Sequence, residues 1–301
     1  MVKTRTRMLL LYQARFLLRT AVLALVAVLY FLYDRAFDAA QGGFFKALSP
    51  MHLLWALWMV DMIFQLFPSR GLVAMGCQKM FRTHAVPSGA QPTAEEWKAW
   101  RKENRRGAAL VAASWLVLTA AIAVLRFAGV LRTKELVLLS AIFYVCVLIC
   151  VLFWCPFQKL MMKNRCCTTC RIFNWDHIMM FTPMAFLGSF FALSLFGMSL
   201  VVLVVWELQY ARHPELFWDK TNAALRCSNC SDKLCTIKRH CSAKARAVAA
   251  GAVSAAAGVA STAAAVSDKA AAVAEITAGA VAEAAQNTAA AVTRKRKLRV
   301  K

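Results

Sequence analysis

Long apolar runs are the feature that most restricts how this chain can fold. A helix that crosses a bilayer needs roughly 20 apolar residues, because the hydrocarbon layer is about 30 Å thick and a helix rises about 1.5 Å per residue. Apolar runs occupy residues 20–33, 51–67, 108–125, 135–154 and 178–208, and hydrophobic residues make up 60% of the 301-residue chain. The pattern predicts an all-α, polytopic integral membrane helix bundle.

The length of the last run leaves the number of membrane segments open. As one straight helix, the 31 residues of run 178–208 would extend about 46 Å, and Pro183, Gly188 and Gly197 interrupt it. One long tilted or kinked span gives five spans in total. A re-entrant or hairpin arm followed by a full span gives six membrane segments. The stretch Asn174-Trp175-Asp176 predicts an interfacial anchor and the N-cap of the helix that starts this run.

The excess of basic residues predicts the orientation of the bundle. Lysine and arginine outnumber acidic residues by 37 to 15, which gives a formal net charge of +22. In multi-pass membrane proteins such residues collect in cytoplasmic loops. The basic lead, residues 1–19, and the polar loop 69–107 therefore predict a cell-membrane protein with a cytoplasmic N-terminus. Arg15 and Arg19 share one helical face, from which we expect them to snorkel to the inner headgroups.

Changes in composition divide the chain into six parts. These are a basic lead (1–19), a four-span membrane unit (20–154), a cysteine-rich loop (155–177), a membrane segment (178–208), a second cysteine-rich segment (209–242) and an Ala/Val low-complexity tail with a basic end (243–301). The bilayer is the predicted partner, and the basic loop and tail predict contact with anionic lipids. Nothing in the sequence indicates a specific nucleic acid or a particular protein partner.

The polar loop contains a predicted helix of its own. Thr93 and Glu96 have the spacing of a capping box, in which each side chain bonds the backbone N–H of the other residue. Behind the box, residues 97–106 place Trp97 and Trp100 on one face among basic residues. Such a helix is expected to lie at the membrane surface, or to lead as a solvated helix into the next span.

Three polar side chains interrupt the second apolar run. They are His52, Asp61 and Gln65, and Asp61 lies well inside the run. An ionisable residue at that depth is costly and is by default a functional hypothesis. One hypothesis is a small transporter or proton path around Asp61. The other is an acid that pairs with a basic or polar group of a neighbouring helix.

Two Cys-x-x-Cys pairs are the strongest candidates for chemistry. Cys167 and Cys170 form the first pair, and Cys227 and Cys230 form the second. Two such turns can supply the four thiolates of a tetrahedral zinc site. Further donors close to these pairs are Cys155, Cys166, Cys235, Cys241, His177 and His240. If run 178–208 returns the chain to the side it left, both pairs belong to one small cytoplasmic subdomain, where thiols stay reduced and bind metal.

A redox function is the alternative for these cysteines. Cys155-Pro156 resembles the Cys-Pro that closes ferredoxin-type iron–sulfur motifs in some membrane redox proteins, although Val151 and Leu152 stand where those motifs need a further cysteine. The resemblance implies an iron–sulfur cluster, and the Cys-x-x-Cys spacing alone would also permit dithiol exchange. If the second pair lies outside the cell, a disulfide knot is expected instead.

No sequence motif of a common enzyme class is present. The chain has no P-loop, no Gly-x-Gly-x-x-Gly, no His-Glu-x-x-His and no nucleophile elbow. We therefore expect a protein without enzymatic activity, in which the zinc site is mainly structural.

Overall fold

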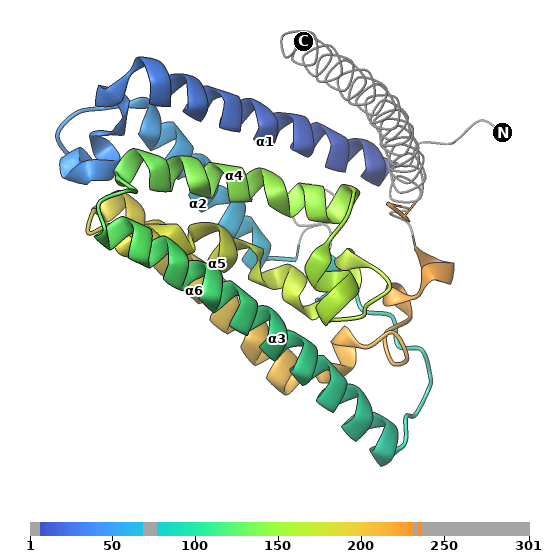
Figure 1. Ribbon diagram of the computed structural model, residues 1–301. Coiled ribbons are helices and arrows are strands. Elements are labelled where there is room, and N and C mark those ends of the chain that lie inside the picture. The colour runs from blue at the N-terminus through green and yellow to red at the C-terminus, as the bar shows by residue number, and fades with distance from the viewer. Residues whose placement is uncertain (1–6, 69–76, 231–233, 236–301) are drawn as a thin grey trace, which may run out of the picture. The chain divides into compact units, whose positions relative to one another are not determined.

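The computed structural model describes residues 7–68, 77–230 and 234–235, and this part of the chain is helical (Figure 1). Within it, β-type pairing is limited to one isolated bridge between Pro87 and Asn222. The all-α prediction is therefore confirmed for the described residues. The predicted tail 243–301, with Cys241 and His240 just before it, lies outside them.

Four of the described helices are long and apolar enough to span a membrane. They are α1 (Arg7–Leu32), α3 (Ala94–Phe127), α4 (Thr133–Leu152) and α6 (Phe190–Arg212). The second predicted span is the 17-residue α2 (Pro50–Leu66), which is apolar but shorter. The helices support a transmembrane protein, whereas the count of five spans or six segments remains a prediction.

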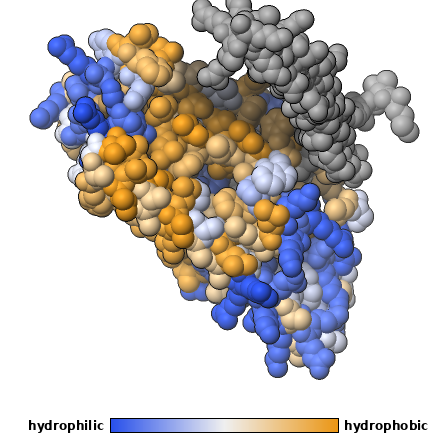
Figure 2. Space-filling view, in the orientation of Figure 1, coloured by the Kyte–Doolittle hydropathy of each residue, from blue (hydrophilic) through white to orange (hydrophobic). Residues whose placement is uncertain are grey.

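Large apolar side chains cover the sides of the long helices. Leu17 of α1, Val117 of α3 and Val204 of α6 are each more than half exposed. Figure 2 shows apolar residues across the middle of one face and hydrophilic residues gathered at its two ends. Because apolar surface of this extent is unfavourable in water, the sides of the helices indicate contact with a lipid bilayer.

Helix α3 begins at the predicted capping box and continues without a break into the third apolar run. The Glu96 N–H donates to Thr93 Oγ1 (3.3 Å), and the Thr93 N–H donates to Glu96 Oε2 (2.9 Å). Trp97 and Trp100 pack on Trp218, with ring centroids 4.8 and 5.1 Å away. The helix predicted for 97–106 therefore leads directly into the next apolar run, and Trp218 covers its tryptophan face.

The last apolar run is broken, and the chain reverses there. Helix α5 (Asp176–Phe181) continues as a 3₁₀ turn that starts near Pro183, and α6 begins only at Phe190, capped by Ser189. Near the other end of α6, Glu207 accepts hydrogen bonds from Arg171 and from Trp175 Nε1, the latter at 2.7 Å. A residue before α5 thus meets the end of α6, as a hairpin requires and one straight span does not.

Helix α5 lies in the interior of the bundle. Its Phe181 contacts Trp58 of α2 at a ring separation of 5.2 Å, and Trp58 in turn contacts Tyr144 of α4 at 6.1 Å. Trp58 and Phe181 are fully buried. This aromatic core holds the end of α5 beside α2 and α4.

Asn222 ties the segment behind α6 to the loop behind α2. Its buried carboxamide forms four hydrogen bonds to backbone groups: Oδ1 accepts from the N–H groups of Val86 and Ala224, both at 3.1 Å, and Nδ2 donates to the carbonyls of Lys79 and Leu216, both at 2.9 Å. A carboxamide offers two donors and one acceptor oxygen, so this side chain is fully used. The two polar segments therefore form one structured end of the molecule.

Candidate functional site

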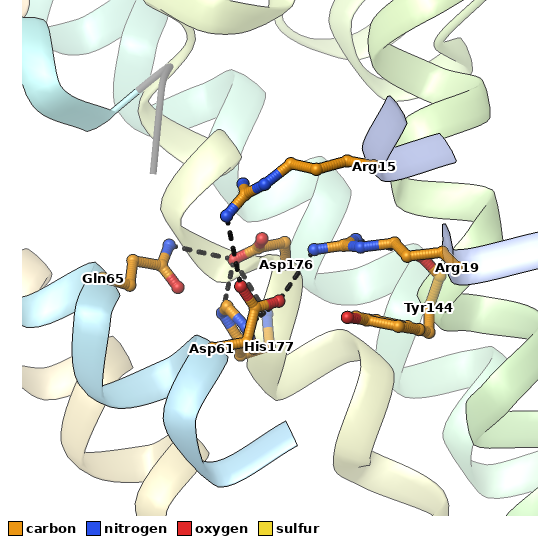
Figure 3. A network of polar contacts seen from close by, with 7 residues as sticks. All are labelled: Arg15, Arg19, Asp61, Gln65, Tyr144, Asp176 and His177. Atoms are coloured by element: carbon orange, nitrogen blue, oxygen red, sulfur yellow. Dashed lines mark hydrogen bonds and ion pairs between the residues drawn. The ribbon is translucent and has the colours of Figure 1, made fainter. Parts of the chain in front are cut away.

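A network of polar side chains lies inside the bundle (Figure 3). It draws on four helices, and its members are Arg15 and Arg19 of α1, Asp61 and Gln65 of α2, Tyr144 of α4, and Asp176 and His177 of α5. On α1 and on α2 the two members are four residues apart, so each pair projects from one face of its helix. We refer to these seven residues as the charge network.

Asp61 has three cationic or titratable neighbours. Its Oδ2 lies 2.9 Å from Arg19 Nη2 and 3.7 Å from His177 Nε2, and its Oδ1 lies 3.6 Å from Arg15 Nη2. The Asp61 side chain is 13% exposed and that of Arg19 is 7% exposed, whereas that of Arg15 is 23% exposed. This is the arrangement expected if Asp61 pairs with basic groups of a neighbouring helix, because a buried charge requires compensation.

Arg19 is held from two further directions. Its Nη1 donates to the Tyr144 carbonyl at 3.0 Å, and its guanidinium lies 3.9 Å above the Tyr144 ring. The predicted snorkelling of Arg19 to the headgroups is therefore wrong. The carboxylate inside the bundle offers a stronger partner than the headgroup layer does, because attraction between charges increases as water is excluded.

The second carboxylate of the network meets the opposite side of the histidine ring. Asp176 Oδ1 lies 3.1 Å from His177 Nδ1 and accepts a hydrogen bond from Gln65 Nε2 at 3.1 Å. Asp176 is the first residue of α5, and Trp175, within the stretch 174–176 predicted to contain the cap, occupies the N-cap position without a side-chain cap bond. With a neutral imidazole, two arginines balance two aspartates, and one further proton makes the network cationic.

Each of the two carboxylates also lines a separate hollow. Asp61, Arg15 and Arg19 line a cleft of about 160 Å³ between α1 and α2. Asp176 lines an apolar cavity of about 110 Å³, whose walls come from α3, α4, α5 and the cysteine-rich loop. His177 therefore stands between two carboxylates that face different spaces.

His52 has a role apart from the charge network. It is the third residue of α2, where its Nδ1 accepts from the Ser49 N–H at 3.0 Å and its Nε2 donates to the Phe44 carbonyl at 2.7 Å. These bonds satisfy groups at the start of the helix. Of the three polar residues singled out in the second apolar run, the structure brings Asp61 and Gln65 into the network and leaves His52 outside it.

The two Cys-x-x-Cys pairs have the same backbone turn. The Cys170 N–H donates to the Cys167 carbonyl at 3.0 Å, and the Cys230 N–H donates to the Cys227 carbonyl at 3.3 Å. The two stretches also meet, because Cys166 and Cys227 line one cleft at the end of the bundle where Asn222 is anchored. The reversal before α6 is what brings them to the same end.

The side chains of the first pair face inward. Cys167 and Cys170 are buried and line the apolar cavity together with Cys146, Cys150 and Cys155. Burial raises the pKa of Cys170 to about 12. Cys227 and Cys235 are exposed, and Cys230 is half-buried. Within the residues that the structure describes, no three histidine, cysteine, aspartate or glutamate side chains lie close enough together to hold a metal ion.

No protein-family model, curated protein or solved structure matches this chain. The site is therefore interpreted from its own geometry. The sequence singled out Asp61 and Gln65 but assigned Arg19 and Asp176 to other roles. The sequence did contain a signal for this pairing. Arg15 and Arg19 are four residues apart, as are Asp61 and Gln65, so a basic helical face and an acidic, polar one have the same spacing and could have been predicted to pack together.

Proposed function

We propose that this membrane protein passes protons along Asp61, His177 and Asp176. The supporting observation is that each ring nitrogen of His177 faces a different carboxylate, at 3.7 and 3.1 Å, and that each carboxylate lines a different hollow. Imidazole can take a proton on one nitrogen and release another from the opposite nitrogen. Ionisable chains inside membrane bundles are a recurrent form of proton relay.

Both contacts of the histidine ring are short, but neither is an aligned hydrogen bond. His177 Nδ1 lies 3.1 Å from Asp176 Oδ1 without forming a hydrogen bond, so transfer there needs a rotation of the ring. The contact between His177 Nε2 and Asp61 is 3.7 Å, so it needs a shift of roughly half an ångström to reach the same length. Arg15 and Arg19 balance the two aspartates, which limits the cost of holding the relay away from water.

Proton flux into proteoliposomes tests this function. Purified full-length protein is reconstituted around a pH-sensitive dye, and a membrane potential is imposed with potassium and valinomycin. We expect His177→Gln to lower the initial flux at least about tenfold, because glutamine cannot relay a proton through two ring nitrogens. His213→Gln is the matched control, since His213 is partly exposed, lies outside the charge network and contacts only Glu215 among the ion pairs of the described residues.

Folding must be checked separately, because His177 is buried. Each variant is therefore compared with the wild type by its elution volume and thermal midpoint before reconstitution. Wild-type flux no greater than that of empty liposomes would contradict the proposal. Equal flux through wild type and a folded His177→Gln protein would contradict it as well.

A structural metal site is a second proposal, favoured by one observation. The two Cys-x-x-Cys pairs share a turn and lie at the same end of the bundle, where Cys166 and Cys227 line one cleft. We propose that Cys167, Cys170, Cys227 and Cys230 turn toward one zinc ion there, with Cys155, Cys166, Cys235 or Cys241 as substitutes. Zinc would replace the protons of buried thiols such as Cys170. An iron–sulfur centre is the alternative use of the same thiols.

We propose that this site lies on the cytoplasmic side, and the packing of the N-terminal half of α1 supports this placement. Leu9 and Tyr12 pack in one cluster with Cys155, Cys167 and Leu234. If the N-terminus is cytoplasmic, both cysteine stretches are cytoplasmic too, and their thiols stay reduced. The hypothesis is therefore a cell-membrane protein with a cytoplasmic N-terminus and a cytoplasmic zinc site, and its two parts can be tested together.

Metal analysis and thiol labelling test that hypothesis. We expect a colourless preparation with about one zinc per chain, and loss of that zinc in Cys227→Ser/Cys230→Ser. A brown protein that absorbs near ~400 nm would instead support the iron–sulfur centre. In intact cells, labelling of the exposed Cys227 by a membrane-impermeant maleimide would overturn the cytoplasmic placement, and a metal-free protein would overturn both cofactors.

A further inference from the structure

A large cleft opens at the end of the bundle where the two cysteine stretches meet. It encloses about 670 Å³. Its walls are formed by Trp100, Glu103 and Asn104 of α3, by residues 162–166 with 169, and by residues 217–220 and 225–228. We call it the basic cleft. Its volume falls within the range of roughly 300–1,000 Å³ that is usual for small-molecule sites.

Positive charge dominates the lining. Four cationic side chains, Lys163, Arg165, Lys220 and Arg226, face two acidic ones, Glu103 and Asp219. Among the described residues, Lys163, Arg165 and Arg226 form no ion pair, whereas Lys220 Nζ lies 2.5 Å from Glu96 Oε1. With Lys220 paired, three cations still face two acidic side chains, so the lining remains net positive.

Arg226 is fixed in position by backbone groups. Its Nε donates to the Asp219 carbonyl and its Nη2 donates to the Lys220 carbonyl, both at 2.9 Å. Two carbonyls orient the guanidinium but do not neutralise it. A planar, pre-oriented guanidinium is well suited to bind phosphate oxygens through paired N–H groups.

An aromatic wall stands beside these cations. The rings of Trp100 and Trp218 stack at 5.1 Å with an interplanar angle of 16°, and the buried Phe217 also lines the cleft. Tryptophan is enriched where a membrane protein meets the headgroup layer. On α3, Asn104 lies four residues before Ala108, where the apolar run begins, which is about 6 Å along the helix. A bilayer that covers the apolar run of α3 would therefore put the inner part of the cleft at headgroup depth.

We propose that the basic cleft binds the phosphate group of an anionic phospholipid. Lys163, Arg165 and Arg226 would hold the phosphate, and the tryptophan wall would lie along the glycerol and upper acyl chain. The proposal goes beyond the proton relay and does not rest on it, because the basic cleft and the charge network share no residue. The net positive lining favours an anionic ligand, and the headgroup depth favours a lipid over a soluble anion.

Native mass spectrometry of the full-length protein tests this site. The protein is released from detergent after titration with phosphatidylglycerol or, separately, phosphatidylcholine. We expect one phosphatidylglycerol to bind and Lys163→Gln/Arg165→Gln to weaken it roughly tenfold to thirtyfold, since each basic residue near an anionic surface contributes a factor of about five. Both side chains are exposed and free of ion pairs among the described residues, so folding should be retained.

The matched control removes the same charge elsewhere on the same end. Lys98 and Lys102 are exposed residues of α3 that do not line the cleft. Lys98→Gln/Lys102→Gln should bind phosphatidylglycerol as the wild type does. Competition by millimolar glycerol 3-phosphate would show that the cleft recognises the soluble phosphoester as well, and no competition would assign it to the membrane lipid. Equal weakening by both double variants, or unchanged binding in Lys163→Gln/Arg165→Gln, would overturn the proposal.

Discussion

Replacing Arg19 by methionine should lower the free energy of unfolding by about 3–5 kcal/mol, the loss typical of removing one partner from a buried ion pair. Asp61 would lose its nearest cation, at 2.9 Å, and the Tyr144 carbonyl would lose its donor. Methionine preserves most of the side-chain volume, so packing changes little. Thermal and denaturant unfolding in detergent would measure the effect.

A second substitution shows whether the loss of stability comes from leaving Asp61 unpaired or from disturbed packing around position 19. Asp61→Asn combined with Arg19→Met removes both charges, so the double variant should be more stable than Arg19→Met alone. Arg15→Met is the matched control, because Arg15 is farther from Asp61, at 3.6 Å, and more exposed. It should cost less than about 1 kcal/mol. Equal losses for the Arg15 and Arg19 variants would contradict a central role for the Arg19–Asp61 pair.

Gly107→Leu should destabilise the protein by about 3 kcal/mol, at the upper end of the usual cost of overpacking. Helix α3 approaches the loop behind α4 so closely here that a Cβ atom on Gly107 would lie 3.1 Å from the Met161 carbonyl oxygen and 3.2 Å from Met162 Cα. Backbone atoms cannot move aside as a side-chain end can. Unfolding in detergent, compared with the wild type, measures the loss.

Gly197 provides the control for this substitution. It lies within α6, and a Cβ atom there would meet nothing within 4 Å. Gly197→Leu should therefore change stability by less than about 1 kcal/mol, with the better helix propensity of leucine acting in its favour. If both glycine variants lost the same stability, close packing at Gly107 would not be the cause. Because Met162 also lines the basic cleft, Gly107→Leu should disturb that cleft as well.

The helices were predictable because their signals are local. An apolar run is recognisable from neighbouring residues, and the capping box of α3 depends on Thr93 and Glu96 alone. The long run 178–208 could be interpreted in two ways, since Pro183 and Gly188 permit a break without specifying which way the chain continues. The observed reversal depends on distant contacts, such as those of Glu207 with Arg171 and Trp175.

The charge network was predictable only in part. The cost of burying Asp61 indicated that it would have a partner, and Gln65 followed from helical periodicity. The partner itself, Arg19, is 42 residues away, and it also reaches the Tyr144 carbonyl 125 residues further along the chain. The four-residue spacing of Arg15 and Arg19 could not distinguish arginines that pair with Asp61 from arginines that reach the headgroups, because in both cases the two side chains project from the same face of α1.

The cysteines show the same division between local pattern and distant packing. Each Cys-x-x-Cys pair forms the turn that its spacing implies. Their side chains, however, face different surroundings: the cavity for Cys167 and Cys170, and solvent for Cys227. Membrane character, helices and turns follow from the free energy of short segments in lipid or water. Which charges meet, which thiols are buried and where the clefts open depend on how the helices pack and on the reversal before α6, because tertiary contacts bring distant residues together.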